Sequence, residues 1–306
     1  MPTRRSTLAA AVGVLFAPAL AASAQERAPV PVVATFSILG DFVRNVGGDR
    51  IRLTTLVGPD GDGHVYAPTP ADARRLAEAK VVIANGLGYE GWIGRLVKSS
   101  GTKATLVEAA KGVEPLKEEG SGHGSHGHRH AAFDPHAWQS VPNAKLYVAA
   151  IRDALVAADP AGKETYEANA VAYGAKLDAL DAEVRAAVAR IPADRRRVIT
   201  SHDAFGYFEK AYGIDFVAPQ GVSTEAEASA RDVARIIQQM KRERIGAVFL
   251  ENVSDPRLVE RIARETGATV GPTIYSDALS GPDGPAPTYI EMIRHNMGAI
   301  GAALSS

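Results

Sequence analysis

The pattern of apolar and polar positions divides most of the chain into two halves, and each half alternates short apolar runs with amphipathic stretches. The apolar runs are rich in Val, Ile and Thr and too short for helices, so they predict β-strands. The predicted strands cover residues 31–39, 51–57, 81–85 and 103–109 in the first half and 196–201, 214–219, 246–251 and 268–274 in the second. Strands that alternate with helices are typical of parallel sheets covered on both faces. The sequence therefore predicts an α/β fold with two parallel-sheet lobes.

A long segment with helical periodicity separates the two halves. Apolar side chains recur in it at spacings of three, four and seven residues, and it contains no proline between Pro160 and Pro192. Asp159 and Pro160 form a start signal, and Pro192 is a stop signal. The pattern predicts one rigid linking helix over residues 159–191, with a length of roughly 46 Å at about 1.5 Å per residue. Such a helix would join the two lobes and restrict hinge motion between them.

The N-terminus has the pattern of a cleavable export signal. Two arginines, Arg4 and Arg5, precede an apolar run over residues 8–21, and a small-residue cleavage site ends at Ala24. The run is short for a membrane span, so a membrane anchor is the weaker alternative. We therefore predict four parts, which are a signal peptide (1–24), an N-terminal α/β lobe (25–158), the linking helix (159–191) and a C-terminal α/β lobe (192–306). Export by the general secretory or the twin-arginine route would place the protein in the periplasm.

Composition narrows the kinds of partner and of metal site. The formal net charge is −1, which implies no basic surface, so nucleic acid is not an expected partner. The chain has no cysteine, which excludes disulfides, thiolate metal sites and a lipid-modified N-terminal cysteine. Any site for a first-row metal must therefore use imidazole and carboxylate ligands.

Four side chains follow predicted strands. His64 comes after the second strand, His136 after the fourth, His202 at the end of the fifth, and Asp277 past the last. Ligands of α/β sheets bind beyond the carboxyl ends of the strands, so all four residues are expected around one cleft between the lobes. Three imidazoles and a carboxylate favour Zn²⁺ over Mn²⁺, whose sites contain more oxygen ligands. The structural alternative is that each is an ordinary surface or core residue without a ligand role, which is how we interpret His295 on the last predicted helix.

A glycine-rich tract contains half of the chain's eight histidines. The sequence "GSGHGSHGHRH" (120–130) belongs to a predicted His-rich loop over residues 120–131, and its histidines are His123, His126, His128 and His130. The tract has no aliphatic side chain to bury, so one interpretation is a solvated loop without a role. The preferred hypothesis is weak, reversible capture of metal by the closely spaced imidazoles.

Five strings in order along the chain resemble a known family. They are "GHVYAPTPADARRL…AKVVIANGLGYEGW", "DPHAW", "TSHDAFGYF", "LENVSDPR" and "YSDALS". Together they resemble the zinc- and manganese-specific solute-binding proteins of ABC importers, the cluster A-I metal-binding family, over about residues 31–304. The resemblance implies two lobes joined by a rigid helix, with His64, His136, His202 and Asp277 as ligands of one metal ion. It also implies a His-rich loop ahead of the second histidine in zinc-selective members, and Glu in place of His202 in manganese-selective ones.

The chain departs from the family pattern at two of these positions. The family commonly has Asp-Pro-His at the first ligand, whereas this chain has Asp62-Gly63-His64, so a looser loop is expected. Many zinc-selective relatives lack a carboxylate at the fourth position, so binding of Asp277 through one or two oxygens is left open. Ligating imidazoles usually donate their second N–H to a carboxylate or carbonyl, and Glu251, Asp203 and Asp134 are candidates for this supporting role. Each of these three is also a candidate helix cap or loop-fixing residue.

The functional prediction is a periplasmic binding protein that captures Zn²⁺ in a His₃Asp site and delivers it to an inner-membrane ABC permease. We expect a monomer, and a periplasmic metallochaperone is a further possible partner. A manganese-binding member of the same family is the first alternative. A zinc-dependent hydrolase is the second, but it would require an open coordination position and a general base. The chain has neither a His-Glu-x-x-His nor a Gly-x-Ser-x-Gly motif, so we predict that it is not an enzyme.

Overall fold

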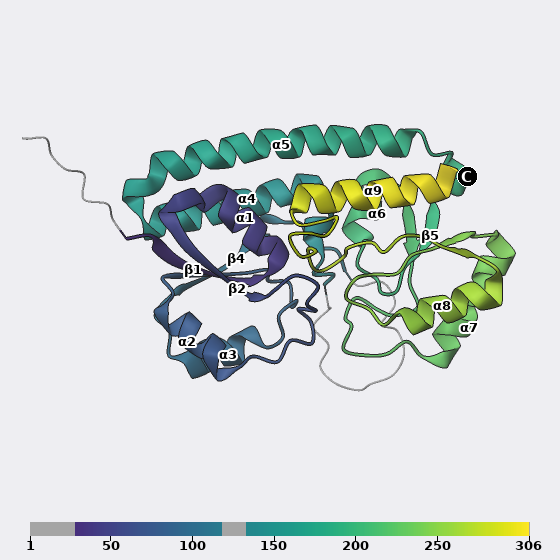
Figure 1. Ribbon diagram of the computed structural model, residues 1–306, viewed down its shortest axis with the longest axis horizontal. Coiled ribbons are helices and arrows are strands. Elements are labelled where there is room, and N and C mark those ends of the chain that lie inside the picture. The colour runs from purple at the N-terminus through teal and green to yellow at the C-terminus, as the bar shows by residue number, and fades with distance from the viewer. Residues whose placement is uncertain (1–27, 118–132, 306) are drawn as a thin grey trace, which may run out of the picture.

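The computed structural model describes residues 28–117 and 133–305 (Figure 1). The predicted signal peptide (1–24) and the four histidines of the predicted His-rich loop, His123, His126, His128 and His130, lie outside the described residues.

The N-terminal lobe is a parallel sheet with helices on both faces. Its strands run in the order β2-β1-β3-β4 and are β1 (Val30–Phe36), β2 (Ile51–Val57), β3 (Val81–Ala84) and β4 (Thr105–Glu108). Figure 1 shows helices α1 (Ser37–Gly47) and α4 (Val141–Ala158) on one face and α2 (Pro70–Glu78) and α3 (Ile93–Ser100) on the other. This confirms the predicted α/β class for the first half.

The C-terminal lobe repeats this topology with shorter strands. The order β6-β5-β7-β8 again places the first strand of the lobe inside the sheet, with β5 (Arg197–Ile199), β6 (Asp215–Val217), β7 (Ala247–Val248) and β8 (Thr269–Val270). Helices α7 (Ala230–Glu243) and α8 (Pro256–Thr266) cover the outer face, and α6 (Gly206–Tyr212) and α9 (Tyr289–Ser305) lie on the other face (Figure 1). The strands are shorter than predicted because pairing beyond them is limited to isolated bridges, such as His202 with Gln220 and Glu251 with Ile274.

One long helix, α5 (Lys163–Ala189), runs along both lobes, as Figure 1 shows. It begins at Lys163 rather than at residue 159, because a 3₁₀ turn (Pro160–Gly162) precedes it. The side chain of Asp159 accepts hydrogen bonds from Arg50 (2.7 Å) and from the hydroxyl of Tyr166 (2.9 Å). The predicted rigid connection between two parallel four-stranded sheets is confirmed.

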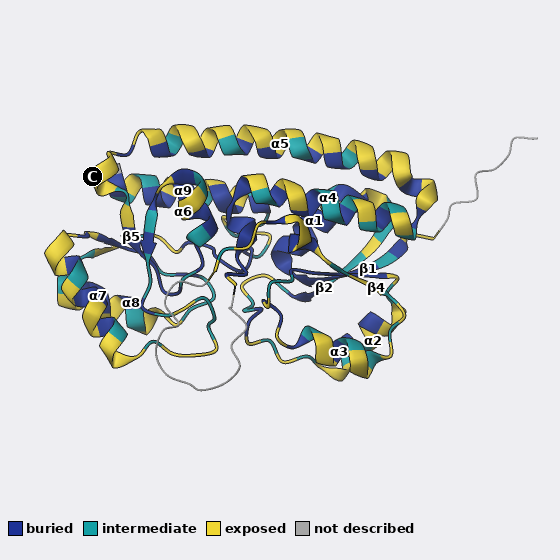
Figure 2. Cartoon of the chain, turned by 180° about the vertical axis from the view of Figure 1, so that it is seen from behind, coloured by how far each residue is buried: buried dark blue, intermediate teal, exposed yellow. Residues whose placement is uncertain are grey.

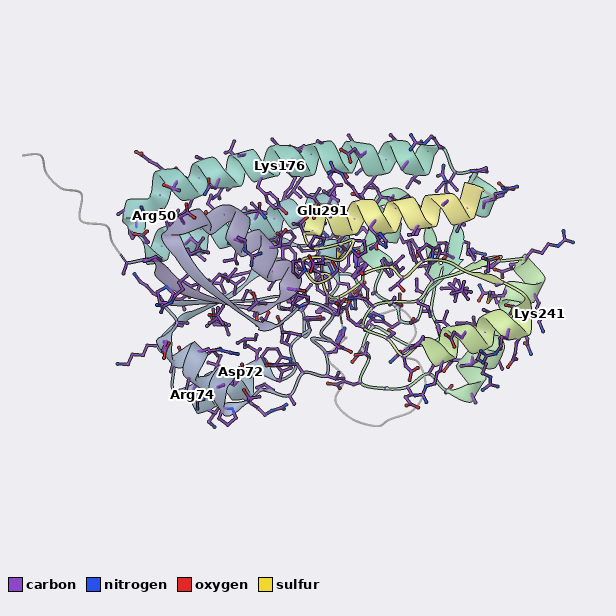
Figure 3. All side chains as sticks on the ribbon, viewed as in Figure 1. Arg50, Asp72, Arg74, Lys176, Lys241 and Glu291 are labelled. Atoms are coloured by element: carbon purple, nitrogen blue, oxygen red, sulfur yellow. The ribbon has the colours of Figure 1, made fainter. Side chains whose placement is uncertain are left out.

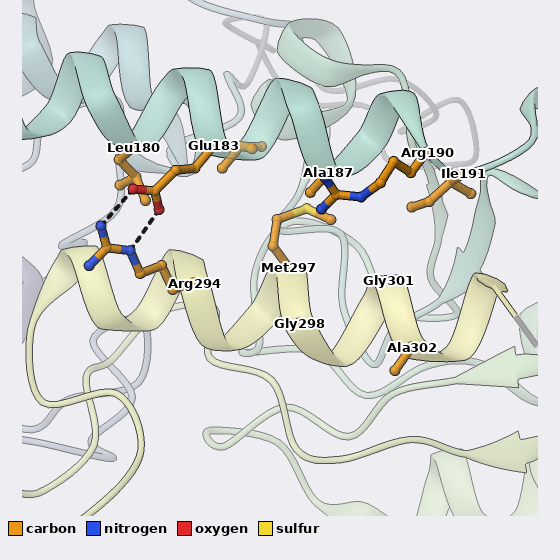
Figure 4. Close-up of a pocket in the computed structure, with 11 residues that line it drawn as sticks. Leu180, Glu183, Ala187, Arg190, Ile191, Arg294, Met297, Gly298, Gly301 and Ala302 are labelled. Carbon is orange, nitrogen blue, oxygen red and sulfur yellow. Dashed lines mark hydrogen bonds and ion pairs between the residues drawn. The ribbon is translucent and has the colours of Figure 1, made fainter.

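Helix α9 packs beside α5, and a groove of about 500 Å³ lies between them. Figure 4 shows an ion pair between Glu183 and Arg294 in this groove, with Nε to Oε2 at 2.8 Å. Gly298 and Gly301 of α9 leave open space there, since an added Cβ would meet no atom within 4 Å at either position.

The apolar core extends through both lobes. One cluster contains side chains from β1, α1, α4, α5, α6 and α9, and a smaller cluster lies between the second sheet and the helices α7 and α8. Figure 2 shows buried residues along the sheets and the inner helix faces, and exposed residues along the outer face of α5. Charged side chains such as Lys176 and Lys241 project from the outer helices (Figure 3). Among the described helices, none is both long and apolar enough to cross a membrane.

Candidate metal centre

The structure brings His64, His136, His202 and Asp277 together between the lobes. One nitrogen or oxygen of each lies within 4.8 Å of the corresponding atoms of the other three. His64 is 6% exposed, and the other three are 0% exposed. The N-terminal lobe supplies the first two residues and the C-terminal lobe the last two, as the strand-end rule predicts.

The distances between the ligand atoms suit a small tetrahedral cation. Oδ2 of Asp277 lies 3.2 Å from Nε2 of His64 and 3.3 Å from Nε2 of His202, and the Nε2 atoms of His64 and His136 are 3.2 Å apart. A tetrahedron with its ligands about 2.0–2.1 Å from a central Zn²⁺ has edges of about 3.3 Å. Oδ1 of Asp277 also faces Nε2 of His136, at 3.5 Å.

The charges at this site favour a bound cation. Within the described chain, both oxygens of Asp277 and Nε2 of His202 are buried without a hydrogen-bond partner. Burial raises the pKa of Asp277, but the imidazoles of His136 and His202 outweigh it and hold this pKa well below the ordinary value. Buried polar atoms are normally paired, and a cation at the centre of the four side chains would pair all of them. The residues present therefore fit a divalent metal.

Neighbouring carboxylates raise the pKa of two of these imidazoles and so favour their protonated form. Burial lowers the pKa of His136, but Asp277 and Asp134 raise it to about 9. For His202, Glu251 and Asp277 likewise outweigh burial and raise the pKa well above the ordinary value. A divalent cation would replace these protons, because only neutral imidazole binds metal.

Two of the three predicted supporting carboxylates contact a ligand. Oδ1 of Asp134 lies 2.8 Å from Nδ1 of His136, and Oε2 of Glu251 lies 2.7 Å from Nδ1 of His202. Oε1 of Glu251 also accepts hydrogen bonds from the backbone N–H groups of Ser201 (2.7 Å) and His202 (2.9 Å). These contacts direct the Nε2 atoms towards the centre of the site. Asp203 is half-buried, and its backbone N–H donates to the carbonyl of Gly221 (3.3 Å).

Two tryptophans also donate hydrogen bonds to the backbone next to the ligands. The sequence did not predict these contacts. The indole N–H of Trp92 donates to the carbonyl of Gly63 (2.8 Å), and that of Trp138 donates to the carbonyl of Ser276 (2.9 Å). Each accepting residue directly precedes a predicted ligand in the sequence. The only sequence signal was the presence of both tryptophans within strings that resemble the family.

Comparisons with known proteins identify the family. The family described as "Zinc-uptake complex component A periplasmic" matches residues 32–303. The chain is 36% identical to the iron-binding protein YfeA of Yersinia pestis, over 88% of this chain and 84% of that protein. It is 30% identical to the manganese ABC transporter substrate-binding lipoprotein PsaA of Streptococcus pneumoniae, over 90% and 88%.

Comparison with solved structures identifies the same fold. The periplasmic zinc-binding protein TroA of Treponema pallidum has a TM-score of 0.84 to this structure at 30% sequence identity, and the match covers 90% of this chain and 99% of that one. The names of these relatives refer to iron, manganese and zinc. With its buried His₃Asp site and this fold, the chain belongs to the metal-binding solute-binding proteins of ABC importers, a family of carriers and not of enzymes.

Proposed function

We propose that this protein captures Zn²⁺ in the periplasm and delivers it to the permease of an ABC importer. The observation that carries the proposal is the ligand set, in which three imidazole nitrogens and one carboxylate oxygen lie within 4.8 Å of one another and are almost fully buried, with three of the pairs 3.2–3.3 Å apart, about one tetrahedral edge. Nitrogen-rich ligation favours Zn²⁺, whereas Mn²⁺ sites contain more oxygen. A closed shell without an open position suits a protein that holds metal rather than one that uses it in a reaction.

The roles of the individual residues follow from this proposal. His64, His136, His202 and Asp277 are the ligands, and Asp134 and Glu251 orient His136 and His202. Both oxygens of Asp277 face imidazole nitrogens, so the carboxylate can bind through either oxygen. Signal cleavage after residue 24 and export by the secretory or twin-arginine route would place a monomer beside the permease, and a metallochaperone could load it there.

Metal content after purification tests the choice of metal. The protein, purified without added metal, is dialysed against equal concentrations of Zn²⁺ and Mn²⁺ and then analysed for both. We expect about one tightly held Zn²⁺ per chain and little Mn²⁺, in line with the order of affinities of nitrogen ligands. Asp277→Ala is the matched control, since it removes one ligand and should lose the tightly held ion. Stoichiometric Mn²⁺ in the wild-type protein would overturn the zinc assignment.

The histidine tract has a separate role in this proposal. His123, His126, His128 and His130 gather Zn²⁺ weakly and pass it to the buried site. Deleting residues 120–131 is therefore expected to leave one tight site and to lower the total zinc bound at saturation, as measured by equilibrium dialysis. Loss of the tight site on deletion would show instead that the tract is part of the fold of that site.

A further inference from the structure

The segment that carries His64 lies against the loop that follows β3. A Cβ added to Gly63 would lie 2.5 Å from the hydroxyl oxygen of Tyr89, 2.7 Å from its Cε1 and 2.8 Å from its Cζ. These distances are far inside van der Waals contact, and the atoms belong to a buried ring. Gly63 is not among the glycines with positive φ, so it is required here for space and not for backbone conformation.

The ring of Tyr89 is held firmly in this position. Its side chain is 1% exposed and packs against Phe36 and Trp138, with ring centroids 4.8 and 5.0 Å apart. The edge-to-face contact with the imidazole of His64 has a centroid distance of 4.5 Å. Tyr89 therefore contacts both Gly63 and the predicted ligand His64.

The loop behind Tyr89 is anchored and strained. The buried carboxylate of Glu90 accepts hydrogen bonds from the backbone N–H of Asn85 (2.7 Å) and the hydroxyl of Thr35 (2.6 Å). Three consecutive residues, 86–88, have positive φ values of 86°, 55° and 86°, and the second of them is Leu87. A non-glycine residue in this region is strained, and such strain is common at functional sites. The ring consequently cannot move away from Gly63 without disturbing this loop.

The hydroxyl of Tyr89 faces the backbone of Gly63 but lacks the geometry of a normal hydrogen bond, so close packing of the ring is its main contact with this segment. The indole of Trp92, from the same loop, fixes the carbonyl of Gly63 (2.8 Å). The segment at Gly63, which was predicted to be looser, therefore packs against the ring of Tyr89 and accepts a hydrogen bond from the indole of Trp92.

We propose that Gly63 and Tyr89 form a matched pair that positions His64 for metal binding. Tyr89 fills the space that a larger residue at position 63 would occupy, and it holds the imidazole of His64 at the angle that directs Nε2 to the ion. The proposal rests on the assignment of His64 as a ligand. Tyr89 is a positioning residue, because it acts on the metal only through His64.

The test is a set of paired substitutions. Gly63→Ala alone should push the segment away from Tyr89 and weaken Zn²⁺ binding by about tenfold or more, the usual range for changes to groups that orient a ligand. The double variant Gly63→Ala/Tyr89→Leu should recover most of this loss, because leucine has no atoms where the outer ring carbons lie. The matched control Gly63→Ala/Tyr89→Phe keeps those ring carbons and should not recover it.

Three measurements separate positioning from folding. Zn²⁺ affinity is measured by competition with a chelator, the visible absorption of the complex with Co²⁺ reports ligand geometry, and metal-free thermal unfolding reports the fold. We expect Gly63→Ala to reduce the intensity of the Co²⁺ bands, and the leucine double variant to restore it. Glu183→Gln, which removes the exposed ion pair between α5 and α9, is the control that should bind Zn²⁺ as the wild type does.

Wild-type affinity in Gly63→Ala, or equal affinity in the two double variants, would overturn the matched pair. A wild-type protein that prefers Mn²⁺ would instead contradict only the proposed zinc function, because the same variants can be compared with Mn²⁺ as the probe.

Discussion

At the residue scale, the site depends on which nitrogen of each imidazole faces the ion. Asp134 and Glu251 lie 2.8 and 2.7 Å from the Nδ1 atoms of His136 and His202, so Nδ1–H can donate outward while Nε2 faces Asp277. Carboxylates in this position fix the tautomer and increase the basicity of the ligand. They also favour the protonated imidazoles when no metal is bound.

Glu251→Gln is expected to weaken Zn²⁺ binding about 10- to 100-fold, the usual effect of removing such a carboxylate. The amide keeps the size of the side chain but removes the negative charge next to Nδ1 of His202. Affinity is measured by competition with a chelator. Glu260→Gln, at an exposed glutamate of α8 in the same lobe, is the control and should have little effect, and a larger loss in the control than in Glu251→Gln would contradict the assignment.

The pKa values predict how metal-free stability depends on pH. The pKa of His136 is about 9 in the folded protein, against about 6.5 in an unfolded chain. Because the folded protein has the higher pKa, protonation of His136 stabilises the fold. This stabilisation is fully present below about pH 6.5 and is lost as the pH rises through about 9. Urea unfolding of the metal-free protein should therefore show a free energy of unfolding that falls by on the order of 3 kcal/mol over this range. His136→Gln should reduce the dependence of the free energy of unfolding on pH. An unchanged dependence in this variant would contradict the role given to His136.

At the scale of elements, one buried carboxylate joins three helices. Oδ2 of Asp41, on α1, accepts hydrogen bonds from the hydroxyl of Tyr173 on α5 (3.2 Å) and from the backbone N–H of Tyr289 at the start of α9 (3.1 Å). Burial raises the pKa of Asp41, although both hydrogen bonds oppose the rise. The contact ties the first helix of the chain to the linking helix and to the last helix.

Asp41→Ala should lower the free energy of unfolding by about 1–3 kcal/mol, because it leaves two buried donors without an acceptor. Asp41→Asn retains an acceptor oxygen in the same place and should be much less damaging. Urea unfolding of the metal-free protein measures both. Glu183→Gln, which breaks the exposed ion pair between α5 and α9, is the control for a surface contact and should change stability little.

At the scale of the whole molecule, the two lobes meet around the ligands. The side chain of Asn252 donates to Oδ1 of Asp60 (3.0 Å), the backbone N–H of Asp60 donates to the carbonyl of Leu279 (2.9 Å), and the hydroxyl of Thr224 donates to Oδ2 of Asp62 (2.6 Å). A bound ion would add four bonds at this junction, two to each lobe. Metal binding and the closed arrangement of the lobes should therefore stabilise one another.

Removing the metal should destabilise the whole fold. A ligand at about 1,000 times its dissociation constant adds about 4 kcal/mol to the free energy of unfolding. We therefore expect zinc-loaded protein to unfold at a higher temperature than protein treated with a chelator, as measured by calorimetry. Asp277→Ala should show little of this shift, and a full shift in that variant would place the stabilising ion elsewhere.

Much of the fold could be predicted from local patterns. Thr69, Pro70 and Asp72 predict the start of α2, and the structure has a capping box there, with the Thr69 side chain accepting from the N–H of Asp72. The strands of the second half were predicted too long, because apolar composition indicates extended backbone but not where ladder pairing stops. The matched fit of Tyr89 to Gly63 was not predicted, since the two residues are far apart along the chain.

The amino-acid sequence by itself determined the alternation of strands and helices, the long helix between the lobes, and the absence of thiol ligands. These properties depend on periodicity, propensity and composition, which are local. Only the tertiary structure decided that Asp134 and Glu251 contact the imidazoles, and that Tyr89 and Trp92 contact the segment carrying His64. Such contacts depend on how separate loops meet in space, because differences of a few ångströms between side chains decide which groups touch.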